Sequence, residues 1–241
     1  MKFSSAVIEE NRRGFAAVIP DIKCRSPKEG DLLQGRDPVE TAKYLVDRCK
    51  APLLSVVTEK ERFKGSPRLL SDVAKNADVP VLRKDFITSE DQISETKDLG
   101  AAAVLLICAI MDEKNLSMLY EKAAKTGLEP FVEVCAAGEM ELAKKLGARL
   151  IGINNRDIVT LERDGGGPSR TVSLSSGGMP GGALLVSESG ILSADDAKTA
   201  VSAGANAILV GTALWQAQNM GAMYESLRVK REGDKFWAIQ K

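Results

Sequence analysis

The sequence predicts a single (β/α)8 barrel, the TIM-barrel fold of the α/β class, over residues 1–241. Eight short apolar runs recur along the chain at spacings of roughly 20 to 35 residues, and helical patterns separate most of them. Several runs are nearly continuous in apolar residues, as parallel strands covered by helices are. The length of the chain suits one barrel of this kind. A doubly wound open sheet is the alternative, but the usual glycine-rich turn after its first strand is missing.

The expected strands are rich in valine, leucine and isoleucine, and charged or polar residues follow most of them. Because side chains alternate along a strand, residues two positions apart point to the same side. The strands are expected at residues 15–23, 52–58, 79–84, 102–108, 129–134, 149–154, 183–189 and 207–211.

The segments between the strands carry apolar residues at helical spacing, and all five end near a glycine or a proline. Residues 163–182, rich in Gly and Ser, break this rhythm between the sixth and seventh strands. They are expected to form a surface loop, with a mobile lid over the barrel mouth as the alternative. Helices are expected at residues 39–49, 89–100, 112–127, 137–147 and 193–204.

Composition excludes several classes of function. Lys plus Arg and Asp plus Glu number 33 each, which argues against a nucleic-acid partner. The chain has no histidine, so histidine-based zinc sites and serine triads are excluded. The four cysteines lack metal-ligand spacing, and no metal site is expected. No apolar run approaches about 18 residues and no signal-peptide core is present, so we expect a cytoplasmic protein without a membrane partner.

Polar residues stand at the carboxyl ends of the expected strands, which share one mouth in a barrel. Lys84 and Glu133 each lie at the end of an apolar strand, where burial could shift the pKa of the side chain toward neutrality. They are therefore the expected proton-transfer pair. Asp21 and Lys23 share one side of the first strand. The polar residues at the strand ends are Asp21, Lys23, Lys84, Asp85, Glu133, Asn154, Arg156, Glu188 and Ser189.

Two short motifs indicate a phosphate site. The ESGI motif at 188–191 and the VGTAL motif at 210–214 follow the last two strands, and each places a glycine beside a hydroxyl group at the start of a helical segment. Backbone N–H groups at helix starts bind anions, and (β/α)8 barrels often bind phosphate after strands seven and eight. Ser26 could add a hydroxyl from across the mouth.

These stretches resemble the indole-3-glycerol phosphate synthase family. The matching motifs are DIKCRSP, FKGS, PVLRKDFI with a nearby Gln92, FVEV, LIGINNRD, VSESGI and LVGTAL, in the expected order from about residue 17 to 215. The resemblance implies a (β/α)8 enzyme of tryptophan biosynthesis that closes, decarboxylates and dehydrates 1-(2-carboxyphenylamino)-1-deoxyribulose 5-phosphate. It implies no cofactor.

The resemblance also implies roles for individual residues. Lys84 would be the general acid, and Lys23 would pair with the substrate carboxylate. Glu133 would stabilise positive charge and assist dehydration, and Asn154 would position Glu133. The other implied residues are Asp21, Glu188 and Ser189 in the catalytic site, Arg156 as a supporting charge, and Ser26, Gly190, Gly211 and Thr212 at the phosphate. Phe63, Phe86, Leu105 and Leu185 are implied around the ring, with a place in the apolar core as the alternative for each.

Two departures from the family are visible. The family usually has Glu-x-Lys in the first strand, where this chain has Asp21 and Lys23. Family members usually carry a longer N-terminal extension whose helix closes over the site, whereas here about 14 residues precede the first strand. Both departures are expected on the same side of the mouth.

Two other functions stay open at this point. One is an enzyme resembling phosphoribosylanthranilate isomerase that acts on another phosphorylated sugar. The other is a non-catalytic barrel that binds a phosphorylated metabolite. We expect a small-molecule phosphorylated substrate, a monomer or weak dimer, and possible association with other tryptophan-pathway enzymes.

Overall fold

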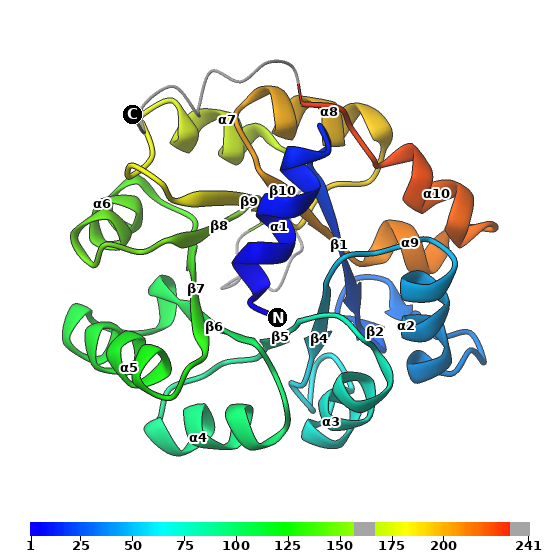
Figure 1. Cartoon of the computed structure of the whole chain (residues 1–241), viewed down its shortest axis with the longest axis horizontal. Helices are drawn as coiled ribbons and strands as arrows, with labels where there is room; N and C mark the ends of the chain where they lie inside the picture. Colours follow the sequence, from blue (N-terminus) through cyan, green and yellow to red (C-terminus); the bar gives the residue numbers. More distant parts are fainter. Residues whose placement is uncertain (157–166, 232–241) are drawn as a thin grey trace.

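The computed structural model describes residues 1–156 and 167–231, and its centre is a closed barrel of parallel strands (Figure 1). The order around the barrel is β1-β10-β9-β8-β7-β6-β5-β4, and β4 closes it by pairing with β1. This confirms the predicted (β/α)8 fold. The barrel strands are β1 (Ala17–Ile22), β4 (Leu54–Val57), β5 (Val81–Lys84), β6 (Ala103–Ile107), β7 (Glu129–Val134), β8 (Leu150–Asn154), β9 (Leu184–Glu188) and β10 (Ala207–Val210).

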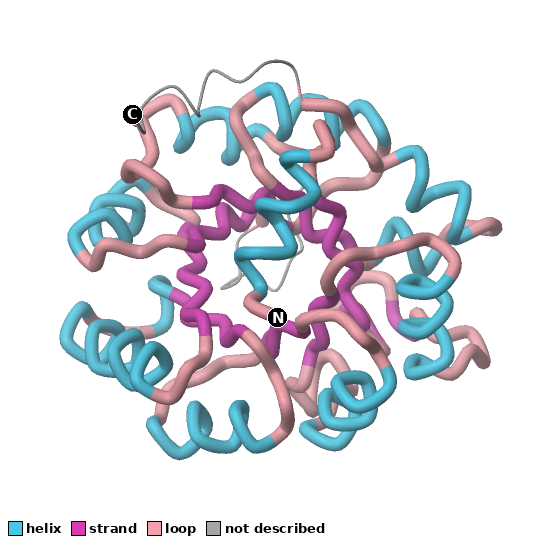
Figure 2. The backbone as a smooth tube through the Cα atoms, in the orientation of Figure 1, coloured by secondary structure: helices cyan, strands magenta, loops and turns pink. Residues whose placement is uncertain are grey.

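Helices surround the ring of strands (Figure 2). The predicted helices are confirmed as α2 (Pro38–Asp47), α4 (Glu90–Asp98), α5 (Glu113–Lys125), α6 (Ala137–Lys145) and α8 (Ala194–Ser202). The elements that were not predicted are α1 (Phe3–Arg12), the hairpin of β2 (Arg25–Ser26) and β3 (Gly30–Asp31), α3 (Pro67–Asn76), the 3-10 helix η1 (Cys108–Ile110), α7 (Ser169–Ser175), α9 (Thr212–Gln216) and α10 (Met220–Ser226). Within the described ranges, no helix is long and apolar enough to cross a membrane.

Two apolar cores follow from the alternation of side chains along the strands. Ile19, Leu105 and Val186 point into the barrel, where they pack with Phe131 and the apolar face of α1. Their neighbours along the strands, such as Leu185, point outward and pack against the helices. A one-residue step therefore decides whether a strand residue faces the barrel interior or the helix layer.

Helix α1 crosses the amino-terminal end of the barrel (Figure 1). The Phe3 ring packs edge-on against Phe131 inside the barrel, with ring centroids 6.5 Å apart. The Ser4 N–H and hydroxyl donate to Glu129 at the start of β7. The expectation that the N-terminal segment lies beside the mouth is therefore wrong, because its apolar face fills the opposite end of the barrel.

Part of the expected loop at 163–182 is helical. Helix α7 begins at Ser169, packs beside β8 and takes the place of the barrel helix between β8 and β9. The expectation of a loop is wrong for this helix. Residues 163–166 lie outside the described residues.

Candidate active site

The barrel gathers polar side chains at the carboxyl ends of its strands. On β1, Ile19 belongs to the interior core, and Asp21 lies two residues further on, facing the same side. Lys23 follows just past the strand. The same two-residue step links an interior apolar side chain to a polar one in the pairs Leu82–Lys84, Phe131–Glu133 and Val186–Glu188.

Lys84 lies between two carboxylates. Its Nζ is 2.8 Å from Glu188 Oε2 and 3.3 Å from Glu133 Oε2. Glu188 and Glu133 are buried, whereas the Lys84 side chain keeps 14% of its surface exposed. The lysine is therefore the member of this cluster that reaches into the open mouth.

The electrostatics of this cluster favour a charged lysine. Burial lowers the pKa of the Lys84 ammonium, but the carboxylates of Glu188, Glu133 and Asp21 outweigh burial and raise this pKa above its usual value. Burial also raises the pKa of Glu188, and the negative charge of Glu133 adds to this effect against the opposing charge of Lys84, so that the pKa reaches about 8. The cluster thus holds a protonated ammonium beside a carboxyl that can bind or release a proton near neutral pH.

The Glu188 carboxylate has room because Gly152, on the neighbouring strand β8, has no side chain. A Cβ atom on Gly152 would lie 2.2 Å from Glu188 Oε1 and 2.3 Å from the Phe131 ring. Oε1 is buried and has no hydrogen-bond partner among the residues that the structure describes, so only Oε2 is held by Lys84.

Two hydrogen bonds hold Asp21, and Gly211 lies close to its carboxylate. Its Oδ1 accepts a hydrogen bond from the Ser55 hydroxyl at 2.7 Å, and its main-chain carbonyl accepts one from Trp215 Nε1 at 2.9 Å. A Cβ atom on Gly211 would lie 3.3 Å from Oδ2. The Asp21 carboxylate is therefore fixed against the barrel wall between β4 and β10.

Asn154 ends β8 and is almost fully buried. Its Oδ1 accepts a hydrogen bond from the Arg156 N–H at 3.0 Å, and its carbonyl accepts one from Arg170 at the start of α7. These bonds shape the turn after β8, so that the Arg156 side chain lines the mouth.

Two adjoining pockets open at the mouth, and Asp21, Lys23 and Lys84 line both. In the first pocket the walls are largely apolar, and Lys23 Nζ lies 5.8 Å from the centroid of the Phe63 ring. The second pocket is mainly polar. The remaining lining residues are Val57, Glu59, Phe63, Asp85, Phe86, Leu105 and Ile107 in the first pocket, and Arg156, Ser189, Gly190, Ile191, Leu192, Leu209, Val210, Gly211 and Thr212 in the second.

The loop after β9 has an unusual backbone. Ser189 has a φ of 63° and Gly190 a φ of 70°. Two successive residues in the left-handed region turn the chain sharply, and a serine adopts this region at a cost in free energy. The turn brings Ser189 and Gly190 to the same pocket as Gly211 and Thr212 from the start of α9.

Comparison with known proteins decides the family. A family model described as indole-3-glycerol phosphate synthase matches residues 1–227. The chain belongs to this family. The indole-3-glycerol phosphate synthase of Pyrococcus furiosus is 45% identical over 202 residues, which are 84% of this chain and 87% of that protein. The indole-3-glycerol phosphate synthase of Streptococcus sanguinis is 39% identical over 89% of this chain and 82% of its own. The indole-3-glycerol phosphate synthase of Carboxydothermus hydrogenoformans is 39% identical over 94% of this chain and 84% of its own length.

The membership confirms the resemblance that the sequence motifs predicted. Of the residues that the family resemblance implies, the structure brings most to the two pockets or to the lysine–carboxylate cluster beneath them. It does not bring Leu185 there, because Leu185 lies an odd number of positions from Glu188 and therefore points outward into the helix layer. Ser26 is also absent from the lining of both pockets. It is fully buried in the β2–β3 hairpin, where its hydroxyl accepts a hydrogen bond from the Glu29 N–H.

Sequence reasoning missed several residues that support the site. Ser55 interrupts an apolar strand and Trp215 follows the last one, and both bind Asp21. A buried serine in an apolar strand was a signal in the sequence, but its partner on another strand was not. Across residues 1–156 and 167–231, no cluster of three or more Cys, Asp or Glu side chains is arranged to hold a metal ion.

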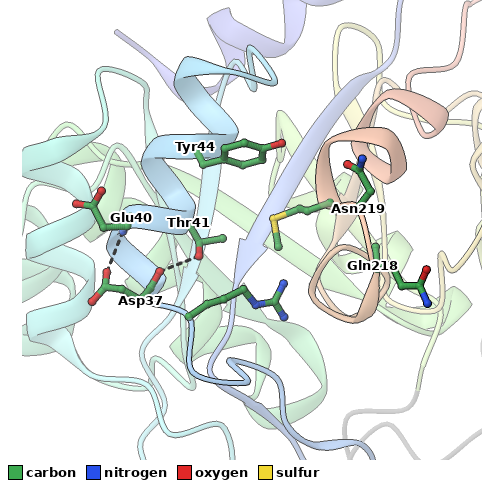
Figure 3. Close-up of a pocket in the computed structure, with 9 residues that line it drawn as sticks. Asp37, Glu40, Thr41, Tyr44, Gln218 and Asn219 are labelled. Carbon is green, nitrogen blue, oxygen red and sulfur yellow. Dashed lines mark hydrogen bonds between the residues drawn. The ribbon is translucent and has the colours of Figure 1, made fainter.

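A further groove of about 450 Å³ lies between α2 and α10, and none of the predicted site residues lines it (Figure 3). Two of its polar side chains, those of Arg36 and Asp37, form hydrogen bonds to the main chain of the protein. Arg36 donates to the main-chain carbonyls of Leu32 and Leu33 as well as that of Trp215, and Asp37 caps the first turn of α2. The groove is therefore not part of the candidate active site of this family member.

Proposed function

We propose that the chain is an indole-3-glycerol phosphate synthase that converts 1-(2-carboxyphenylamino)-1-deoxyribulose 5-phosphate to indole-3-glycerol phosphate, carbon dioxide and water. The observation that carries this proposal is the position of Lys84. Its ammonium lies between two buried carboxylates at the junction of an apolar and a polar pocket. One pocket suits an aromatic ring and the other a phosphorylated sugar chain.

The substrate orientation follows from the two linings. The carboxyphenyl ring would contact Phe63, Phe86 and Leu105, with its carboxylate beside Lys23. The phosphate would bind the backbone N–H groups around Gly190, Gly211 and Thr212, with Arg156 as an additional positive charge. The carbonyl to be attacked would then lie between the two ends, near Lys84.

In the first step, the ring carbon that carries the carboxylate forms a bond to the carbonyl carbon, and Lys84 gives its proton to the carbonyl oxygen. The bond to the carboxylate then breaks, carbon dioxide leaves, and the electron pair of that bond restores the aromatic ring. The fixed ammonium groups stabilise the negative charge that develops on oxygen. No external oxidant or reductant is needed, because the electrons balance within the substrate.

Dehydration completes the reaction. The new hydroxyl group leaves as water with a proton from the site, and the neighbouring carbon loses a proton to form the double bond of the indole. Glu133 would stabilise the positive charge on the ring nitrogen, and Asn154 would help to position Glu133 and the sugar hydroxyls. Glu188 and Ser189 would line the reacting chain, and Asp21 would support the charge of the two lysines.

The test is turnover of this substrate, followed by the fluorescence of indole-3-glycerol phosphate. Lys84→Ala should lower turnover by about 10²–10³ or more, which is the loss that follows removal of one well-placed donor of this kind. Lys43→Ala removes an exposed lysine of α2 that pairs with Glu40, and it should leave turnover unchanged. Full activity of Lys84→Ala would refute its role. Phosphate-ligand binding without turnover would indicate a non-catalytic barrel, and conversion of phosphoribosylanthranilate would indicate an isomerase.

Three features of the setting stay predictions. We expect the enzyme to work in the cytoplasm, as a monomer or weak dimer, and in possible association with other enzymes of tryptophan biosynthesis. Size-exclusion chromatography across a range of protein concentrations would measure the oligomeric state.

A further inference from the structure

The two asparagines at the end of β8 point to opposite sides. Asn154 lies on the inward side of β8, two residues after Gly152, although it lines neither pocket. Asn155 faces outward, toward the start of α7, and it is 6% exposed. Asn155 therefore lies outside both pockets, although it directly follows a residue of the proposed site.

The donors of Asn155 are all directed at the end of β9. Its Nδ2 lies 2.9 Å from the Ser187 hydroxyl, 3.0 Å from the Glu188 carbonyl and 3.1 Å from the Ser189 carbonyl. Its main-chain N–H also donates to the Glu188 carbonyl, at 2.8 Å. Asn155 thus binds the main chain of two successive residues that the family resemblance places in the site.

The side-chain oxygen of Asn155 also has hydrogen-bond partners. Its Oδ1 accepts hydrogen bonds from the Thr171 N–H at 3.0 Å and from the Thr171 hydroxyl at 2.9 Å. The Thr171 hydroxyl lies 2.7 Å from the Ser187 hydroxyl, which closes a buried ring of three polar side chains. Because each of these groups has a partner, the ring is rigid rather than a source of unsatisfied polar atoms.

The segment that Asn155 holds is the strained one. Ser189 and Gly190 both have a positive φ, and the bond from Asn155 to the Ser189 carbonyl fixes the peptide group between them. On the other side of this turn, Glu188 must orient its carboxylate toward Lys84. A backbone conformation of this kind persists only where its surroundings fix it.

We propose that Asn155 is a positioning residue of the active site. It locks the Glu188–Ser189–Gly190 turn, and through this turn it sets the direction of the Glu188 carboxylate and of the backbone that faces the phosphate pocket. This role rests on the proposed function for its kinetic consequences, whereas its structural consequence can be measured without any substrate.

The test compares Asn155→Ala with Thr171→Val. Thr171→Val removes one hydroxyl of the same buried ring but touches no atom of the turn, and the Thr171 N–H still holds Asn155 Oδ1. We expect Thr171→Val to lower the melting temperature while kcat/KM stays within about twofold of the wild-type value. Asn155→Ala should lower kcat/KM at least tenfold, with an increase in KM as well as a decrease in kcat, since a displacement of about 1 Å can cost 10²-fold in rate.

Hydrogen exchange gives the readout that does not depend on activity. Backbone amides of the segment 188–191 should exchange at least tenfold faster in Asn155→Ala than in the wild type, and at the wild-type rate in Thr171→Val. If Asn155→Ala fails to fold, Asn155→Ser, which keeps a shorter polar group, takes its place in both measurements.

The outcomes separate the two proposals. If the wild type does not turn over the substrate but the turn exchanges faster in the Asn155 variant alone, the proposed function fails and the positioning role stands. The positioning role is overturned if the amides of segment 188–191 exchange at the wild-type rate in the Asn155 variant. It is also overturned if their exchange rises equally in Thr171→Val, even if the enzyme is active.

Discussion

Lys84 Nζ and Glu188 Oε2 lie 2.8 Å apart, although the two residues are separated by 104 positions in the sequence. They meet because β5 and β9 each end at the same mouth of a closed barrel and each directs its last residue inward. The position of the Lys84 ammonium therefore depends on the closed barrel, which also brings its second partner, Glu133, to the same end.

Glu188→Gln should change how stability depends on pH. The pKa of the Glu188 carboxyl is raised from 4.5 to about 8, first of all by burial. Between these values the folded protein keeps a proton that the unfolded chain has lost, so stability from this group is full below 4.5 and is lost as pH rises through about 8. The free energy of unfolding of the wild type should therefore fall relative to that of Glu188→Gln as pH rises from about 5 to 8.

Urea unfolding at a series of pH values measures this difference. Glu121→Gln is the matched control, because Glu121 is an exposed carboxylate of α5 that pairs with Lys125. The free energy of unfolding of this control should depend on pH as that of the wild type does. If Glu188→Gln also showed the wild-type dependence on pH, the raised pKa of Glu188 would be contradicted.

Gly152→Ala should displace the Glu188 carboxylate and lower both stability and activity. The new methyl group would lie 2.2 Å from Glu188 Oε1 and 2.3 Å from the Phe131 ring, so one of them must move. Overpacking of this kind costs about 1–3 kcal/mol, and displacement of Glu188 would break its bond to Lys84. We expect lower stability in urea unfolding and at least a tenfold loss of kcat/KM.

Gly138→Ala is the control for this substitution. Gly138 lies in α6, and a Cβ atom there would have no neighbour within 4 Å. Because Gly138 lies in the first turn of α6, this variant should change the free energy of unfolding by less than about 0.5 kcal/mol and should keep full activity. Normal kinetics in Gly152→Ala would mean that the glycine is not required to seat Glu188.

Phe3→Ala should lower stability and leave the chemistry unchanged. The Phe3 ring is fully buried at the amino-terminal end of the barrel, where it packs against Phe131. Removal of a buried phenylalanine side chain costs about 3–5 kcal/mol. Because α1 lies at the end opposite the mouth, kcat and KM should stay within about twofold at a temperature where the variant is folded.

Val172→Ala removes an apolar side chain of similar kind from an exposed position in α7. It should change the free energy of unfolding by less than about 0.5 kcal/mol. An activity loss in Phe3→Ala under folding conditions would imply that α1 influences the mouth after all.

Asp21 and Ser55 should be energetically coupled. The Ser55 hydroxyl donates to Asp21 Oδ1 at 2.7 Å, and Asp21→Glu would extend the carboxylate past this hydroxyl by one methylene. Ser55→Ala should therefore lower kcat/KM severalfold in the wild type and much less in Asp21→Glu. A double-mutant cycle measures this coupling, which ranges from about 0.5 to 3 kcal/mol for residues in contact. Equal effects of Ser55→Ala in both backgrounds would show that the two residues act independently.

Most of the barrel could be predicted because its signals are local. Apolar runs and helical spacing located the barrel strands, and alternation along β1 correctly placed Asp21 and Lys23 on one side. The same alternation could have excluded Leu185 as a wall of the ring pocket, since it lies three residues before Glu188 and so faces the other side. Helix α1 also had a readable pattern in its buried residues Phe3, Ala6 and Val7.

The rest depended on contacts between distant segments. The glycine- and serine-rich stretch around α7 has poor helix propensity, and its helix begins where Asn155 binds the Thr171 N–H. The bond from Ser55 to Asp21 crosses from β4 to β1, and no local pattern indicates it. The spacing of apolar residues in α1 likewise does not indicate which end of the barrel the helix covers, because this depends on its packing against the barrel interior.

The pairing of β1 with β10 bears on how the protein is made. Ala17 pairs with Ala207, so the first barrel strand lacks one neighbour until residue 207 has left the ribosome. At a synthesis rate of about 5–20 residues per second, this takes on the order of 10 to 40 s. During that interval the nascent sheet has two open edges, and Asp21, Lys23 and Lys84 are hydrated rather than enclosed. A ribosome stalled before residue 207 should therefore display an aggregation-prone nascent chain, which binding of a holdase chaperone would reveal.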